Sequence, residues 1–170
     1  LNLAAKILEK AYTQAISSLS EESSVLLYAM EELGALYIMQ GKNVEAEPLF
    51  LEILDIQVSR LGDEHVDVLR SKETLGKIYC SIGDFDKAIE FQEAVLAIRR
   101  KLQGHGHLNV ASSLYNLGLT YEQMGSFQKA FVCLSQALPI SRQSLGAANP
   151  WSQAIEQDFL LLQNKVSSAR

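Results

Sequence analysis

The sequence predicts an all-α array of about eight helices, because one pattern recurs along it at a fixed interval. Leu33, Leu75 and Leu117 each open a Leu-Gly-x-x-Tyr motif, and neighbouring copies are 42 positions apart (75 − 33 and 117 − 75). Other positions repeat in the same register: Gly41, Gly83 and Gly125; Ala46, Ala88 and Ala130; Leu54, Leu96 and Leu138; Gly62, Gly104 and Gly146. In such an array each unit buries its apolar face against its neighbours, so the sequence predicts a solenoid with no strands.

The array is predicted to begin inside a repeat. Residues 1–19 fit the second helix of a truncated unit, since Ala4 lies 42 positions before Ala46. The chain also starts without Met, so we expect it to be a fragment of a longer protein.

The first full unit is predicted over residues 24–60. Apolar residues at helical spacing indicate a helix from Ser24 to Gln40, and Gly41 is expected to end it in a left-handed conformation. Asn43 is the expected N-cap of the next helix, which runs to about Arg60. Pro48 lies early in that helix, where we expect a slight bend.

The second and third full units, residues 65–102 and 107–144, repeat this plan. Their helices are predicted at residues 65–81, 85–101, 107–124 and 127–142. Asp84 is the expected N-cap of the second of these helices. Pro139 falls late in the fourth helix and is expected to kink or end it.

A last helix is predicted over residues 149–167, with Asn149 as N-cap and Pro150 at the first position. It departs from the pattern, because Phe159, Leu160 and Gln163 replace the recurring Leu, Gly and Tyr. Terminal repeats are often atypical, so this is either a capping helix or a degenerate repeat followed by more chain.

Three glycines are predicted inside helices, at Gly34, Gly76 and Gly118. Glycine costs a helix about 1 kcal/mol relative to alanine. We infer that close approach of the partner helix compensates, since the partner helices carry the recurring small residues Ala46, Ala88 and Ala130.

The composition narrows the classes of partner and location that fit the chain. The 170 residues are 48% hydrophobic and 21% charged, as in ordinary folded chains. A net charge of -5 argues against a sequence-independent nucleic-acid partner, which would need clustered Lys and Arg, and against anionic membranes. No apolar run is long enough to span a bilayer. Cys80 and Cys133 occupy different repeat positions, which favours free cysteines and a cytoplasmic location over a disulfide framework.

These motifs resemble the tetratricopeptide repeat, a helix-turn-helix unit that usually has 34 residues. The longer unit here resembles the 42-residue variety found in kinesin light chains. The stretch from Leu61 to Val68 matches the motif that links their units, and Glu45-Ala46-Glu47-Pro48-Leu49 matches their second helix. The resemblance implies a right-handed α-solenoid and a protein-interaction scaffold or adaptor, with motor attachment as one option.

The resemblance also implies a peptide-binding groove, because the first helix of each unit lines the concave face in this family. The groove positions are Tyr28, Glu31, Glu32, Ala35 and Ile38, then Arg70, Glu73, Thr74 and Lys77, then Ser112, Tyr115, Asn116 and Leu119, then Ala154, Gln157, Asp158 and Leu161. Such a surface suits a peptide with apolar anchors and complementary charge, and the Asn116 amide is able to hold a peptide backbone. We expect Lys77, Tyr115 and Asn116 to be the best contacts.

Three other interpretations stay open. Some members of the family clamp a chaperone tail with Lys, Arg and Asn, but Glu73 separates Arg70 from Lys77 here. Self-association through the array ends is an alternative, since Leu1, Leu3 and the run 159–162 are apolar. An enzyme is disfavoured because no catalytic motif or phosphate-binding loop is present.

No cofactor is expected, and no metal. His105 and His107 flank a glycine without a third ligand nearby, and His107 aligns with Asn149 as a helix-start residue. Trp151 has no counterpart in the other units. We expect it to pack over the end of the third unit, with an exposed aromatic anchor for a partner as the alternative.

Overall fold

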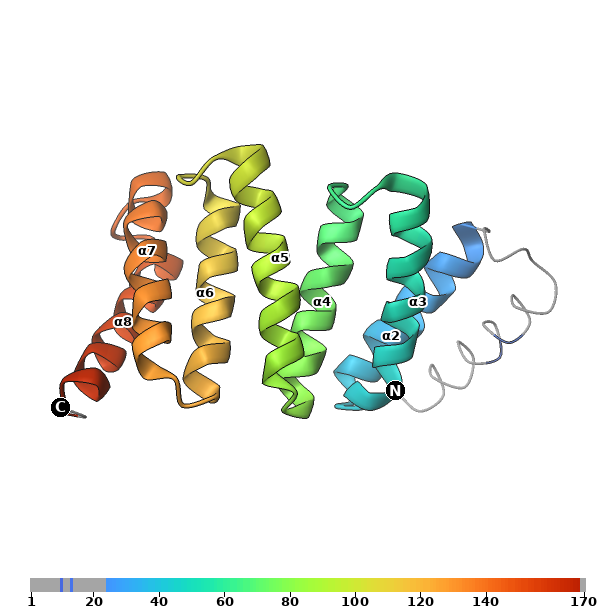
Figure 1. Ribbon diagram of the computed structural model, residues 1–170, viewed down its shortest axis with the longest axis horizontal. Coiled ribbons are helices and arrows are strands. Elements are labelled where there is room, and N and C mark those ends of the chain that lie inside the picture. Colours follow the sequence, from blue (N-terminus) through green and yellow to red (C-terminus); the bar gives the residue numbers. More distant parts are fainter. Residues whose placement is uncertain (1–9, 11–12, 14–23, 169–170) are drawn as a thin grey trace. The chain divides into compact units, whose positions relative to one another are not determined.

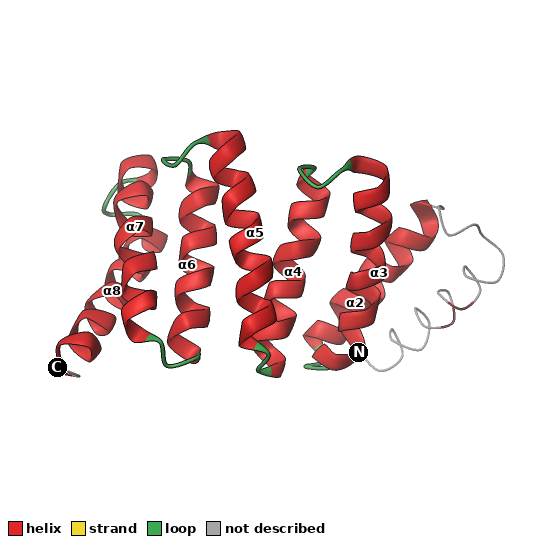
Figure 2. Cartoon of the chain, in the orientation of Figure 1, coloured by secondary structure: helices red, strands yellow, loops and turns green. Residues whose placement is uncertain are grey.

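The computed structural model describes residues 10, 13 and 24–168, and every regular element in those residues is a helix (Figures 1 and 2). The seven helices are α2 (Ser24–Met39), α3 (Asn43–Leu61), α4 (Val66–Ile82), α5 (Phe85–Gln103), α6 (Leu108–Gln123), α7 (Phe127–Leu145) and α8 (Pro150–Ser168). The all-α class is confirmed, and the helix bounds agree with the predicted ones to within three residues. The helix predicted over residues 1–19 lies almost wholly outside the described residues.

The chain divides into two compact units, Leu1–Asp84 and Phe85–Arg170. In the first unit, α3 packs against both α2 and α4. The core of the first unit is apolar, and α2, α3 and α4 all contribute to it. The buried residues are Leu26, Met30, Leu33, Leu36, Ala46, Leu49, Phe50, Ile53, Leu54, Val68, Leu69, Leu75, Ile78 and Tyr79.

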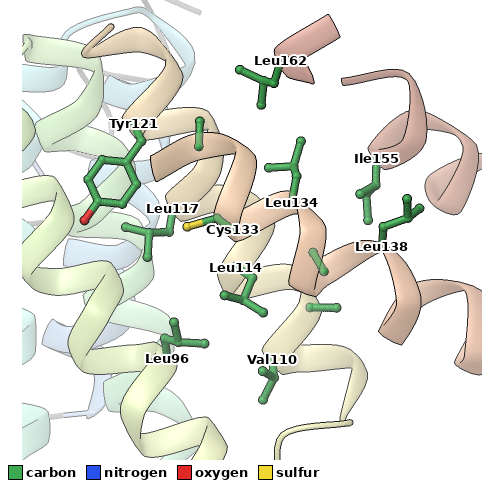
Figure 3. Packing of buried hydrophobic residues seen from close by; sticks show 13 residues of the cluster. Leu96, Val110, Leu114, Leu117, Tyr121, Cys133, Leu134, Leu138, Ile155 and Leu162 are labelled. Carbon is green, nitrogen blue, oxygen red and sulfur yellow. The ribbon is translucent and has the colours of Figure 1, made fainter. Parts of the chain in front are cut away.

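In the second unit each helix packs against the next one along the chain, from α5 to α8. The core of this unit is a single cluster to which all four helices contribute (Figure 3). Its fully buried members include Leu134 on α7 and Ile155 on α8, neither of which exposes any surface.

The turn inside each repeat is set by a glycine in the left-handed region. Gly41, Gly83 and Gly125 have φ values of 73°, 84° and 81°. In the first of these turns the Gly41 N–H donates to the Ile38 carbonyl and the Lys42 N–H donates to the Tyr37 carbonyl, at 3.0 and 2.9 Å. This is the Schellman arrangement, and it explains why Gly recurs at this position of each repeat.

The prediction that Asn43 caps α3 is wrong. The helix already includes Asn43, and Lys42 occupies the N-cap position without a side-chain cap bond. Side-chain capping needs an extended N-cap residue, but the tight turn holds Lys42 at φ -86° and ψ 61°. Ser126 has nearly the same backbone angles before α7 and also makes no cap bond.

The side-chain N-caps at the starts of α8 and α6 are present as predicted. The Trp151 N–H donates to Asn149 Oδ1 at 2.9 Å. His107 has the same role for α6, because its Nδ1 accepts a hydrogen bond from the Asn109 N–H at 3.1 Å. The assignment of His107 as a helix-start residue is therefore confirmed.

Pro139 does not end its helix, since α7 continues to Leu145. A kink at Pro139 and a bend at Pro48 stay predictions.

The helical glycines lie where partner helices come close. A Cβ on Gly34 would be 2.7 Å from the Phe50 ring. A Cβ on Gly118 would overlap Leu134 Cδ1 and lie 3.3 Å from Cys133 Cβ. Close approach is confirmed at these two positions, while for Gly76 it stays a prediction.

We predict that Gly118→Ala destabilises the chain. Alanine gains about 1 kcal/mol in helix propensity. Leu134 is fully buried and packed in the core cluster, so we expect overpacking, which typically costs about 1–3 kcal/mol, to outweigh that gain. Gly106→Ala is the matched control, because nothing lies within 4 Å of a Cβ there. Urea unfolding would measure both variants, and a Gly118→Ala protein as stable as the control would contradict the close contact.

We also predict that the imidazole of His107 acts as a cap and not only as a loop residue. His107→Ala should lower the free energy of unfolding by about 0.5–2 kcal/mol, whereas His107→Asn should be close to neutral because Asn149 already caps α8 in this way. Equal losses in the two variants, measured by thermal unfolding, would exclude the capping role.

Candidate functional site

In the first unit, the predicted groove positions on α2 are mostly open to solvent. Tyr28 is 64% exposed and Ala35 is also exposed. Glu31 is half-buried, and its Oε1 accepts a hydrogen bond from Gln57 Nε2 on α3 at 3.2 Å. Gln57 in turn accepts a bond from the Ser71 hydroxyl at 2.7 Å, so Glu31 belongs to a polar network that joins all three helices of the unit.

The groove positions on α4 carry two cations with different surroundings. Arg70 donates to Asp67 Oδ1 one turn earlier at 2.7 Å, so its charge is partly used within the helix. Lys77 is exposed and forms no ion pair within the described part of the chain. Glu73 lies half-buried between the two. Lys77 is therefore the cation on this face that is best placed to meet a ligand.

In the second unit, Tyr115 is already occupied by contacts within the chain. Its hydroxyl donates to Asp158 Oδ2 on α8 at 2.7 Å, and its ring meets Trp151 edge-on with centroids 6.2 Å apart. Burial, and next the hydrogen bond to Asp158, raise the pKa of Tyr115 to about 12. Two of the predicted groove residues, Tyr115 and Asp158, thus tie α6 to α8.

The side-chain amide of Asn116 is a free polar group on the predicted groove face of α6. The residue uses its backbone carbonyl to accept the Thr120 hydroxyl at 3.2 Å, but the amide forms no hydrogen bond with any described residue. Ser112 and Leu119 lie one turn before and one turn after it, and all three residues are half-buried. The Asn116 amide therefore keeps both its donor and its acceptor for a ligand.

Trp151 is a structural residue, as predicted. It is half-buried, packs against the core cluster of the second unit and contacts Tyr115. An exposed anchor for a partner is not supported.

The apolar run at residues 159–162 is divided between core and surface. Phe159 stacks on Phe131 at 4.8 Å between ring centroids, and Leu162 is buried. Leu160 and Leu161 are 49% and 58% exposed. Leu1 and Leu3, the other predicted end residues, lie outside the described residues.

A cavity that the sequence did not predict lies in the second unit, on the side of α6 away from Asn116. It measures about 450 Å³ and is bounded by α5, α6 and α7. Leu96, Leu117, Val132 and Cys133 line it. Burial raises the pKa of the Cys133 thiol to about 11, so the thiol is protonated at neutral pH.

In the part of the chain that the structure describes, no group of three or more His, Cys, Asp or Glu side chains could hold a metal ion. No described helix has both the length and the apolar character that a membrane span requires.

Comparison with known proteins places the chain in a family. The family model of the tetratricopeptide repeat matches residues 25–101 and 67–143, which together span most of the chain. The chain belongs to the tetratricopeptide-repeat family, a class of non-catalytic repeat scaffolds with an α-solenoid fold.

Its repeats are similar to those of solved kinesin-light-chain structures. The chain resembles a crystal structure from Podosopora anserina, described as a kinesin light chain with nearly identical TPR-like repeats, at 26% identity with a TM-score of 0.83, over 98% of this chain and 79% of that one. A second crystal structure of these Podosopora anserina repeats, a substituted form, aligns at 24% identity with a TM-score of 0.76, over 98% and 88% of the two chains, and shows the fold alone.

A third structure, BtubC (BKLC) from P. vanneervenii, aligns at 28% identity with a TM-score of 0.72. The alignment covers 86% of this chain and 58% of BtubC, so the chain spans less than two thirds of that protein. No match was found among curated proteins.

We predict that Tyr115 makes the chain sensitive to alkali. A tyrosine whose pKa rises from 10.0 to about 12 on folding holds its proton in the folded state but loses it in the unfolded state. Between these pH values the folded state binds more protons, so stability falls as pH rises.

Tyr115→Phe should therefore show a smaller loss of stability between about pH 10 and 12 in denaturant titrations. Tyr28→Phe, which removes an exposed hydroxyl, is the control and should follow the unmodified chain. Parallel curves for all three proteins would show that the bond to Asp158 does not hold the proton.

Proposed function

We propose that the chain is a protein-interaction scaffold that holds a peptide segment of a partner along the first helices of its repeats. In the first unit this face comes from α2 and α4, and in the second from α6 and α8. The proposal includes no cofactor and no covalent chemistry. We place the protein in the cytoplasm, where Cys80 and Cys133 stay reduced as free cysteines.

The observation that carries the proposal is the unused polar groups on this face. The Lys77 ammonium and the Asn116 amide are accessible, sit on the first helix of their units and bond to no other described residue. Side chains that serve only the fold are usually paired or packed, as Tyr115 is. In the first unit the Lys77 ammonium suits a carboxylate of a bound segment, and in the second unit the Asn116 amide suits a peptide backbone.

The chaperone-tail interpretation gains no support, because Arg70 is paired with Asp67 and leaves Lys77 as the only unpaired cation among the described positions predicted for the groove. Self-association through α8 has one observation in its favour, the exposure of Leu160 and Leu161. Analytical ultracentrifugation of Leu161→Glu beside the unmodified chain would test it.

We predict that the groove variant Lys77→Glu with Asn116→Ala loses its partners. Tyr115 is left unchanged because it stabilises the fold. The charge-matched control is Lys87→Glu on α5, an exposed lysine on a second helix of a repeat. After circular dichroism shows equal helicity, each protein is used as bait in a quantitative lysate pull-down. The expected result is at least a tenfold loss of specific partners with the groove variant and none with the control.

Partners retained equally by all three baits would overturn the assignment of the binding face. A peptide from the partner should then bind the unmodified chain in isolation. If the full partner binds but no peptide from it does, the chain recognises a folded surface and the peptide mode is wrong.

A further inference from the structure

The cavity beside Cys133 lies at a position of the 42-residue register where the earlier repeats carry larger side chains. Positions 49, 91 and 133 are equivalent and carry Leu, Phe and Cys. The first unit also has a pocket at the equivalent place, about 460 Å³ and lined by Leu33, Pro48 and Leu49 among others. In the second unit an open volume of about 450 Å³ lies beside Cys133, which we call the Cys133 cavity and define by Leu96, Leu114, Leu117, Val132 and Cys133.

The floor of the Cys133 cavity is apolar. Leu96, Leu114, Leu117 and Cys133 each expose less than a tenth of their surface and belong to the core cluster, and Figure 3 shows them gathered between α5, α6 and α7. The outer lip is apolar as well, since Val132 is 45% exposed. Volumes of this size with mostly apolar walls are typical of sites that take a bulky apolar group.

The rim is polar and favours an anion. Arg100 is held in place by a hydrogen bond from its Nη2 to Gln136 Oε1 at 2.9 Å, while its Nε is buried and has no acceptor. Lys129 lies at the rim with its ammonium 5.1 Å from the ring centroid of Tyr121. The carboxylate of the rim, Glu93, already accepts the Tyr121 hydroxyl at 3.1 Å.

The Cys133 cavity is distinct from the peptide-binding face proposed above. Leu114 and Leu117 line the cavity, whereas Ser112 and Leu119 belong to the proposed face. At about 100° per residue these two pairs lie on opposite sides of α6. A ligand in the cavity would therefore leave the other face free.

We propose that the Cys133 cavity is a second binding site, which takes a bulky apolar side chain of a partner protein whose neighbouring residue supplies a carboxylate to Arg100. The carboxylate satisfies the buried Arg100 Nε and lies within the field of Lys129. The exposed lip at Val132 gives the partner's backbone an apolar surface to lie on. An anchor in a dry pocket with a charged rim is the usual form of an interaction hot spot.

The site is tested by peptide phage display on the whole chain, with Cys133→Phe as the counter-selection target. This substitution puts a larger side chain into the wall of the cavity, and Phe is the residue that the preceding repeat has at this position. Selected peptides should pair Leu, Met, Phe or Trp with an adjacent Asp or Glu. In fluorescence polarisation their affinity should fall at least tenfold in Cys133→Phe and about tenfold in Arg100→Gln, but stay unchanged in the groove variant Lys77→Glu with Asn116→Ala.

Several results would overturn the proposal. Selection of no peptide over the counter-target, or equal affinity for Cys133→Phe, would show that the cavity is not a site. Equal affinity for Arg100→Gln would show that the partner's carboxylate does not bind Arg100. Free 4-phenylbutanoate that binds as tightly as the best peptide would assign the cavity to a small acid and not to a protein. Loss of binding in the groove variant would place these peptides on the other face.

A second measurement does not depend on the folding of Cys133→Phe. In Cys80→Ser, Cys133 is the one remaining thiol of the chain. A saturating selected peptide should slow its alkylation by N-ethylmaleimide at least fivefold, because the bound side chain covers the thiol. An unchanged rate would contradict occupancy of the cavity.

Discussion

The close crossing of the two helices of a repeat is the contact on which this structure depends. On α6, Gly118 has no side chain, and Leu134 and Cys133 of α7 occupy the space that a Cβ would take. The same relation holds between Gly34 and the Phe50 ring in the first unit. Because the partner helix covers the glycine side of the first helix, the opposite side is left for solvent or a ligand. The crossing therefore determines which residues are available for binding.

In both units a hydrogen bond from a tyrosine to a glutamate joins one repeat to the next, but the glutamate stands at a different register position in each. Tyr79 donates to Glu47 at 2.8 Å and Tyr121 donates to Glu93 at 3.1 Å, so a tyrosine hydroxyl bonds to a carboxylate of the preceding helix pair in both units. The two acceptors differ by one helical turn in the register. The tyrosine donor keeps its register position, whereas the acceptor changes.

A second hydrogen bond between repeats recurs at the same two register positions, although the donor and acceptor residues change. Gln57 accepts the Ser71 hydroxyl at 2.7 Å, and Arg99 donates to Ser113 Oγ at the same distance one repeat later. Both members of each pair are 42 positions from their counterparts. Moving another 42 positions gives Ser141, which bonds back to the Leu138 carbonyl of its own helix. The polar joint is thus absent at the boundary between α7 and α8, where the position equivalent to Ser113 is Ile155.

The sequence was sufficient for the features that repeat. The period, the glycine turns and the caps at His107 and Asn149 all follow from local chemistry, so they were predictable. Asn43 was misread because its capping preference is a local tendency, whereas the backbone angles of the turn are set by the glycine before it. Propensity alone does not report that geometry.

The candidate sites were less predictable, because they depend on which partners a side chain finds. The spacing on α6 placed Tyr115 and Asn116 on one face, but it could not show that Tyr115 is bonded to Asp158, 43 positions away, while the Asn116 amide stays free. The cavity beside Cys133 depends on three helices at once. Its counterpart beside Leu49 in the first unit shows that it follows from how the helices pack and not from one residue.

The residues of α8 that replace recurring repeat residues change the surface of this helix. Leu160 occupies the register position of Gly118, so its side chain stands at the position where α7 crosses α6 in the repeat before. Gln153 and Gln163 replace the buried Ala111 and Tyr121 and are exposed. The close crossing by which α7 packs on α6 is therefore not repeated on α8. The capping and degenerate-repeat interpretations both stay predictions, whereas the exposed Leu160 gives this face the apolar position on which the proposed self-association rests.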